Sequence, residues 1–245
     1  MQMTDPANGD LRTFLTKAAN GSSTLIFAGH SLGGALSPTL ALFLYPQPQE
    51  SGWKQVLVLP TAGASPGNEP FAKLFAAAYP PVASGVSAPY GTWNTNYANA
   101  ADAVPHAWNL LDEVIISQPD PAGNYQSIYG VMDPGLALLV GLQITDKKNK
   151  ASGGDYMNIT KSQFTPTWGC WSWQQNPDGT WQHPPVWTEL ARYTDSNPIP
   201  GDQLPTLIGA AHIDQYDQFF GVTPAPRMAI SEPAAKAPDA KAAAD

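Results

Sequence analysis

The sequence predicts an α/β fold, in which a β-sheet is flanked by helices. Between residues 10 and 100, segments with helical periodicity alternate with short, continuously apolar runs, in the order helix, strand, helix, strand, helix, strand. This alternation is typical of a sheet whose faces are covered by helices. The length of 245 residues suits one such domain with insertions, or two small domains, and is sufficient for a large buried core.

The first three elements lie near the N-terminus. "DPANGDLRTFLTKAANG" (5–21) predicts an amphipathic helix, with Asp5 as its N-cap. "TLIFAG" (24–29) predicts a buried strand because its apolar character is continuous. "LGGALSPTLALFL" (32–44) predicts the second helix, which Pro38 should kink or split.

The next three elements complete the alternation. "KQVLVLPTAG" (54–63) predicts a second buried strand. "EPFAKLFAAAYP" (69–80) predicts a helix, with one proline near its start and another after its end. "TWNTNYANA" (92–100) alternates enough to predict a third strand.

After residue 112 the pattern loosens. "DPGLALLVGLQI" (133–144) predicts a short helix, and "DKKNKASGG" (146–154) a solvated loop. "CWSWQQNPDGTWQ" (170–182) predicts a hairpin around the turn N-P-D-G. "IGAAHIDQYDQFFGV" (208–222) predicts a loop that leads into a final helix.

The domain organisation follows from these elements. We expect one domain over residues 1–222, with an insertion or cap region over residues 113–205. From Thr223 the chain consists mainly of Pro, Ala, Lys, Asp and Glu, so residues 223–245 are expected to form a flexible tail.

One short motif carries chemistry. Gly29-His30-Ser31-Leu32-Gly33 fits the pattern G-x-S-x-G and lies directly between a predicted strand and a predicted helix. The chain reverses so sharply at such a serine that glycine is needed on both sides, and the turn lifts the hydroxyl above the sheet. The N–H of Leu32 would then be one oxyanion donor, whereas the second donor is unknown. A glycine-rich turn with an idle serine is the alternative, and the position between strand and helix favours the nucleophile.

This segment also resembles a known family. "GHSLGGALS" closely resembles the nucleophile elbow of the class 3 (fungal-type) lipase family, and "TAGASPGNEPFA" (61–72), "DAVPH" (102–106) and "AHIDQY" (211–216) resemble its later landmarks in the right order. The resemblance implies an α/β-hydrolase-like mixed sheet flanked by helices, with a long insertion between the acid and histidine segments. It also implies hydrolysis of carboxylic esters, with acylglycerols as the default substrate.

The family's upstream elements are not visible in this sequence. In the family, a stretch that reads roughly F-R-G-[ST] supplies the second oxyanion donor, and a lid helix also precedes the elbow. Only 30 residues precede Ser31, so the chain resembles a family member without its N-terminal part. Three interpretations stay open: a fragment or misassigned start, which we favour, substitution by the middle region, or weak activity.

A serine nucleophile needs a base, and the sequence contains four histidines. His212 matches the family's catalytic histidine and follows the last core-like stretch. His106 lies too near Asp102, the acid proposed below, and is expected to be structural. His183 lies beyond the hairpin and is the weaker alternative base. His30 lies inside the elbow and cannot reach the hydroxyl of Ser31 with good geometry.

The base must itself be oriented by an acid. Asp102 follows a predicted strand and precedes Val104, in the position of the family's acidic residue, so we expect it to accept the Nδ1–H of His212. Its rivals are Asp112, Asp202 and Asp214.

Composition excludes some other functions. The formal net charge is −8 with only 12 Lys and Arg, which argues against nucleic acid as a partner. The longest apolar run, at 135–142, is too short to span a membrane, and residues 1–10 show no signal sequence, so the chain as written is expected to be soluble. The resemblance nevertheless permits secretion, and the localisation stays unknown. No metal-ligand cluster appears, and no cofactor is expected.

Five of the eight tryptophans lie between Trp168 and Trp187. They could line an acyl or aromatic pocket or form a lid that meets a lipid–water interface, or they could simply fasten the insertion to the core. The expected partner is a small-molecule ester or lipid. The alternative functions are an acyltransferase or aryl esterase on the same three residues, or a weakly active or inactive lipid- or sugar-binding relative.

Overall fold

The computed structural model describes most of the chain before the C-terminal tail. The described residues are 4–5, 9–86, 89, 91–109, 114, 119–151, 155–194 and 196–225. Of the tail predicted over residues 223–245, the part after Ala225 lies outside the described residues.

The core of the fold is a parallel four-stranded sheet, as the α/β prediction requires. Its spatial order is β12 (Lys161–Phe164), β8 (Asn96–Asn99), β4 (Gln55–Thr61) and β3 (Thr24–His30). Adjacent strands are parallel throughout, with Thr24 opposite Gln55 at the start of the β3–β4 pair. The region predicted as an insertion therefore supplies one strand, β12, to the main sheet.

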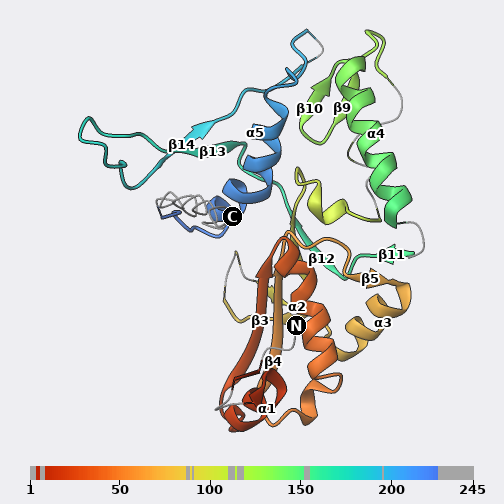
Figure 1. The fold of residues 1–245 in the computed structure, drawn as a ribbon, viewed down its shortest axis with the longest axis vertical. Coiled ribbons are helices and arrows are strands. Elements are labelled where there is room, and N and C mark those ends of the chain that lie inside the picture. Colours follow the sequence, from red (N-terminus) through yellow and green to blue (C-terminus); the bar gives the residue numbers. More distant parts are fainter. Residues whose placement is uncertain are drawn as a thin grey trace, which may run out of the picture.

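Three helices accompany the first strands (Figure 1). They are α1 (Leu11–Ala18), α2 (Leu32–Leu44) and α3 (Glu69–Ala78). The N-cap of α1 is Asp10, whose side chain accepts a 2.8 Å hydrogen bond from the Thr13 N–H, so the prediction of Asp5 was wrong. The helix therefore begins five residues later than an N-cap at Asp5 would place it.

Helix α2 continues through Pro38, so the predicted split does not occur. Pro38 is fully buried, and α2 packs along both β3 and β4. Gly34 allows this close packing, because an added Cβ would overlap the Thr61 carbonyl and lie 2.8 Å from the Cα of Gly63. Tertiary packing therefore holds the helix together across the proline.

A second group of elements lies beyond the sheet, in the upper part of Figure 1. It contains the ribbon of β9 (Tyr125–Ser127) and β10 (Gly130–Met132), helix α4 (Pro134–Ala151), and the hairpin of β13 (Gly169–Ser172) and β14 (Val186–Glu189). A hairpin around the turn N-P-D-G was predicted over residues 170–182, but its second strand, β14, lies beyond that range. The loop predicted from residue 146 was wrong up to Ala151, because α4 continues there with an ion pair of 2.8 Å between Lys150 and Asp146.

The chain returns to the sheet through a continuous helical segment. This segment consists of α5 (Leu204–Gly209), the π-helical turn η4 (Ala210–Asp214) and α6 (Gln215–Phe219). His212 therefore lies inside a helix, and the prediction of a loop was wrong.

The remaining elements are short. They are β1 (Thr4–Asp5), β2 (Gly9–Asp10), η1 (Pro48–Glu50), β5 (Gly67–Asn68), β6 (Val82–Ala83), β7 (Thr92–Trp93), η2 (Val104–His106) and β11 (Tyr156–Met157).

One apolar cluster stabilises the sheet and its helices, and another stabilises the upper region of Figure 1. One lies between the sheet and its helices and includes Phe27, Val58 and Phe75. The other joins the upper region to the returning helical segment, since Trp168 and Ala211 belong to it. The candidate site lies where these two parts meet.

Candidate active site

The strand β3 and the helix α2 meet at Ser31. Its backbone has φ 59° and ψ −119°, a conformation that is unfavourable for a residue with a Cβ and costs about 1–3 kcal/mol. Gly29 permits the turn, because an added Cβ would overlap the Gly33 carbonyl. An added Cβ at Gly33 would meet no atom within 4 Å, so the steric need predicted at both glycines holds only at Gly29.

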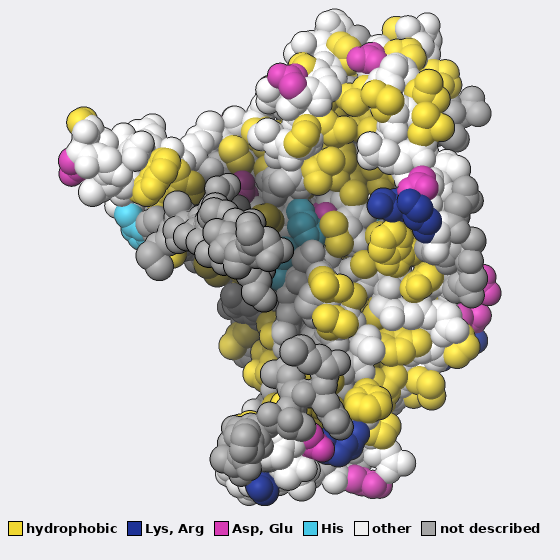
Figure 2. Space-filling view, viewed as in Figure 1, with side chains coloured by type: hydrophobic (Ala, Val, Ile, Leu, Met, Phe, Trp, Pro, Cys, Tyr) yellow, Lys and Arg dark blue, Asp and Glu magenta, His cyan; other side chains and the backbone are white. Residues whose placement is uncertain are grey.

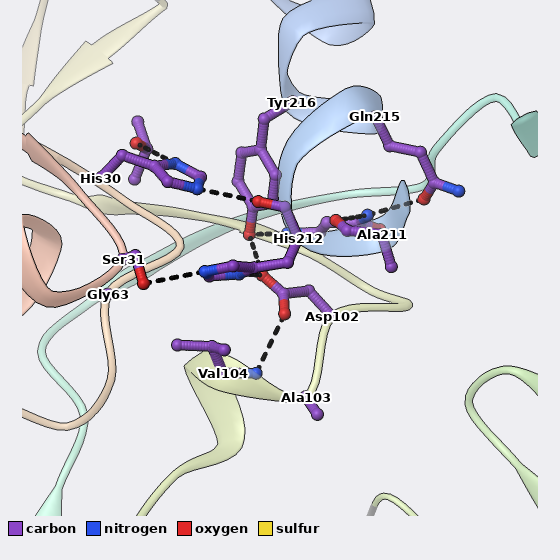
Figure 3. A network of polar contacts seen from close by, with 12 residues as sticks. His30, Ser31, Gly63, Asp102, Ala103, Val104, Ala211, His212, Gln215 and Tyr216 are labelled. Carbon is purple, nitrogen blue, oxygen red and sulfur yellow. Dashed lines mark hydrogen bonds and ion pairs between the residues drawn. The ribbon is translucent and has the colours of Figure 1, made fainter. Parts of the chain in front are cut away.

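The structure brings Ser31, His212 and Asp102 together (Figure 3). The Ser31 Oγ lies 2.8 Å from His212 Nε2, and His212 Nδ1 lies 2.9 Å from Asp102 Oδ2. The ionised carboxylate can only accept, so His212 carries its proton on Nδ1 and leaves Nε2 to accept the serine proton. This is the arrangement that a serine nucleophile requires.

Asp102 is buried, with 1% of its residue surface exposed, and is held by two further hydrogen bonds. The Val104 N–H donates to Oδ1 at 3.0 Å, and the Tyr216 hydroxyl donates to Oδ2 at 3.1 Å. Burial and then the charge of Asp102 raise the pKa of Tyr216 well above its ordinary value, so Tyr216 stays a phenol donor. The carboxylate is thereby fixed in the orientation that meets His212.

Sequence reasoning did not assign a role to Tyr216 or to the amides around it. The Asn99 side-chain amide donates to the Ala211 carbonyl and to Gln215 Oε1, each at 2.8 Å. The Asn99 N–H also donates to the Tyr216 hydroxyl at 2.8 Å. These bonds connect the end of β8 to the helical turn that carries His212. The position of Tyr216 in the segment "AHIDQY" was a sequence signal that it belongs to the site. Nothing in the sequence indicated a role for Asn99 or Gln215.

His30 supports the same turn from the other side. Its Nε2 lies 2.8 Å from the His212 carbonyl and its Nδ1 lies 3.1 Å from the Thr61 hydroxyl. A carbonyl only accepts, so Nε2 carries the proton. Although the residue as a whole is exposed, its ring packs 4.9 Å from the ring of His212 and 5.1 Å from the ring of Tyr216. Burial of the ring and then the nearby His212 lower the pKa of His30.

The rival residues lie elsewhere. His106 is buried, and His183 is exposed with its ring 6.1 Å from that of Trp173. Asp202 is exposed, and Asp214 faces a separate cavity. The structure places none of these four against Ser31, and Asp112 lies outside the described residues.

Leu32 is the first residue of α2, and its side chain is 70% exposed. The N–H groups of a first helical turn have no intrahelical acceptor and carry the positive end of the helix dipole. The role of the Leu32 N–H as an oxyanion donor stays a prediction, and the second donor stays unassigned.

The described part of the chain contains neither of two other kinds of functional feature. No group of three or more His, Cys, Asp or Glu side chains there could hold a metal ion. No helix in the described ranges has both the length and the apolar character needed to cross a membrane.

The fold and the serine-centred site define an α/β-hydrolase-like protein. Residues 2–110 match the model of the family described as "Lipase (class 3)", and the resemblance to the class 3 lipase family predicted from the sequence is therefore confirmed over these residues.

The fold resembles that of a solved lipase. The crystal structure of M37 lipase matches with a TM-score of 0.53 and 21% sequence identity, over 87% of this chain and 52% of that one. The chain thus spans about half the length of the lipase that it matches. The search of curated proteins found no significant match.

Proposed function

We propose that this chain is a serine carboxylic-ester hydrolase of the lipase type. The observation that carries the proposal is the unbroken hydrogen-bonded series from Ser31 through His212 to Asp102, at 2.8 and 2.9 Å. The confirmed resemblance to class 3 lipases over residues 2–110 supports ester substrates.

The proposed reaction has two halves. The Ser31 hydroxyl attacks the ester carbonyl carbon while His212 Nε2 accepts its proton, and the Asp102 carboxylate stabilises the resulting imidazolium. His212 then donates that proton to the departing alcohol as the acyl-enzyme forms. Water attacks the acyl-enzyme by the same route and releases the acid, with Ser31 and His212 restored.

The negative charge on the tetrahedral oxygen would lie near the N-terminus of α2. The Leu32 N–H and the positive helix end favour that charge. A missing oxyanion donor costs about 10²–10³ in rate, so the source of the second donor governs how active this chain is.

The surroundings of Ser31 favour an apolar substrate. One side of α2 exposes Leu32, Leu36, Leu40 and Phe43, beginning next to the proposed nucleophile. Helix α4 exposes Leu138, Leu139 and Leu142. Figure 2 shows hydrophobic side chains gathered on one face of the molecule, over α4 above and over α2 and α3 below. An acylglycerol or another ester with apolar acyl chains fits this surface better than a charged substrate does.

Hydrolysis of a nitrophenyl ester series tests the proposal. We expect release of nitrophenol from short- and long-chain esters, and loss of turnover to background in Ser31→Ala. Ser22→Ala, at an exposed serine outside the site, serves as the matched control. Undiminished turnover in Ser31→Ala would refute the proposal, and the chain-length profile separates an esterase from a lipase.

The acyltransferase alternative uses the same acyl-enzyme with a different acceptor. Product analysis in the presence of an added alcohol separates the two. Free acid as the main product supports hydrolysis, whereas ester formed with the added alcohol as the main product supports acyl transfer.

A further inference from the structure

Asn99 is the last residue of β8 and contacts both the turn that carries Asp102 and the turn that carries His212. It is buried, with 1% of the residue surface exposed. The proposed reaction assigns it no step, although burying a polar amide is unfavourable unless all of its hydrogen bonds are made. Its contacts therefore indicate what it does.

Asn99 closes the turn that carries the acid. The Asn99 carbonyl accepts the Asp102 N–H at 3.0 Å, and Asn99 Oδ1 accepts the Ala101 N–H at 2.9 Å. The carboxylate is also reached indirectly, since the Asn99 N–H donates to the Tyr216 hydroxyl at 2.8 Å. That hydroxyl donates to Asp102 Oδ2 at 3.1 Å. The backbone and the carboxylate of Asp102 are thereby both tied to Asn99.

The Asn99 amide also holds the turn that carries the base. Its Nδ2 donates to the Ala211 carbonyl and to Gln215 Oε1, each at 2.8 Å. Ala211 directly precedes His212, and Gln215 follows His212 by three residues. These residues lie on one helical segment (Figure 3). The two contacts therefore hold this segment on both sides of the proposed base.

The orientation of the amide follows from its backbone partners. The Ala101 N–H can only donate, so it faces Oδ1, and the Ala211 carbonyl can only accept, so it faces Nδ2. The second N–H of Nδ2 is used by Gln215 Oε1. The position thus requires one acceptor and two donors on a short side chain, which an asparagine amide supplies and an aspartic acid does not.

The helical turn around His212 has an unusual form. It is a π-helical turn, a rare kind that occurs mostly as a single turn within α-helices and often at functional sites. Asn99 at the end of β8 holds the Ala211 carbonyl of this turn. His30 at the end of β3 holds the next carbonyl in the chain, that of His212. Only the first of these two side chains is buried and also holds the turn of the acid.

The geometry points to Asn99 as a positioning residue for the proposed ester hydrolysis, on which this inference rests. By holding both turns, Asn99 keeps His212 Nδ1 against the Asp102 carboxylate and keeps Nε2 directed at the serine hydroxyl. It acts through the two turns and not on the substrate, so its loss should lower kcat and leave KM nearly unchanged. A catalytic group displaced by about 1 Å can lose about 10² in rate.

Asn99→Asp tests the inference with a side chain of nearly the same shape. A carboxylic acid has one proton to donate and a carboxylate has none, so in either form Ala211 or Gln215 loses its donor. We expect kcat for a nitrophenyl ester to fall about 10²-fold, with little change in KM. An unchanged kcat in the folded variant would overturn the inference.

Asn94→Asp is the matched control. Asn94 is also buried, and its amide accepts the Val58 N–H at 2.8 Å and donates to the Pro80 carbonyl at 2.9 Å. The same substitution there changes a buried amide before the amino end of β8, whereas Asn99 lies at the carboxyl end. We expect Asn94→Asp to keep its kcat. An equal fall in both variants would overturn the inference, because the loss would then report damage to the fold.

Proton NMR tests the geometry without a substrate. The His212 Nδ1–H, bonded to a carboxylate, should give a signal at low field that is absent from His212→Gln. We expect this signal to shift or broaden in Asn99→Asp and to stay unchanged in Asn94→Asp. An unchanged signal in Asn99→Asp would contradict the positioning of His212 by Asn99.

Gln215→Met decides the question if circular dichroism shows that Asn99→Asp does not fold. It removes one acceptor of the Asn99 amide and keeps a side chain of similar length, so kcat should fall about fivefold with little change in KM. Unchanged kcat in this variant would then overturn the inference. Absence of ester turnover in the unmodified chain would be a failure of the proposed function, whereas normal turnover in folded Asn99→Asp would be a failure of this inference alone.

Discussion

Residues 24–99 and residues 119–194 contribute strands in contrasting ways. In the first region β3 and β4 are seven residues long, and each strand pairs in parallel with the next main strand along the chain. In the second region most strands pair antiparallel within a ribbon or hairpin, and only β12 joins the main sheet. The first region therefore forms a continuous platform, and the second forms separate pieces attached to it.

The site shows what this difference means for function. Ser31 and Asp102 follow β3 and β8 at the carboxyl ends of parallel strands, where the fold class places its reactive groups. His212 comes from the returning helical segment, and Gln215 in this segment donates to the Gly169 carbonyl on β13 at 3.4 Å. We infer that the platform sets the chemistry and the second region shapes the surroundings.

The largest expected effect concerns Asp102, the carboxylate that directly follows the platform. Asp102→Asn leaves the side-chain shape intact but no longer stabilises the imidazolium, so ester turnover should fall about 10⁴-fold. Initial rates with a nitrophenyl ester measure this loss. Asp202→Asn, at an exposed aspartate, should keep its activity, and a loss of less than tenfold in Asp102→Asn would argue against the proposed role.

The same glycine substitution should have opposite effects in the two regions. Gly34→Ala places a methyl group against the backbone of Thr61 and Gly63, so α2 must move from the sheet and the free energy of unfolding should fall by about 1–3 kcal/mol. Gly141→Ala, inside α4, meets no atom within 4 Å and should raise the free energy of unfolding by about 0.5–1 kcal/mol. Urea denaturation measures both. Similar changes at the two positions would contradict the distinction between a glycine in close backbone contact and a glycine with open space beside it.

The elements of the platform could be predicted because their signals are local. The apolar runs of β3 and β4, and the glycine at position 29, report burial and a steric limit within a few residues. Asp102 and His212 could also be predicted, through chain order and the resemblance to a family. The hydrogen bonds around them join Asn99 to Gln215 and Tyr216, and Tyr216 to Asp102, across more than 100 residues of the chain, and no local pattern encodes them.

The second region was harder to predict because some of its elements pair with segments that are distant in the sequence. The turn N-P-D-G indicated the hairpin β13–β14, but nothing near Lys161 indicated that β12 would pair in parallel with β8. Helix α4 continued to Ala151 although the charged run from residue 146 resembles a loop, because charged residues four apart support an exposed helix.

A smaller effect is expected from the hydrogen bond that holds Asp102. Tyr216→Phe removes the donor to Oδ2 and keeps the ring, so kcat should fall about tenfold with little change in KM. Tyr97→Phe provides a control, because its hydroxyl bonds to the Thr92 carbonyl on the sheet side and not to Asp102. Equal values of kcat for Tyr216→Phe and the unmodified chain would limit Tyr216 to a structural role.

The smallest effect concerns the pH dependence of stability at His30. Burial of the ring lowers its pKa in the folded chain below the value of about 6.5 that the unfolded chain has. As the pH falls below about 6.5, the unfolded state takes up a proton at this histidine before the folded state does, so the free energy of unfolding decreases; above about 6.5 this group contributes no slope. His30→Gln should therefore lose less stability between pH 7 and pH 5 than His183→Gln, which removes an exposed histidine of the hairpin. Urea midpoints at the two pH values measure the difference, and a steeper loss in His30→Gln would show that the platform's histidine is protonated in the folded state.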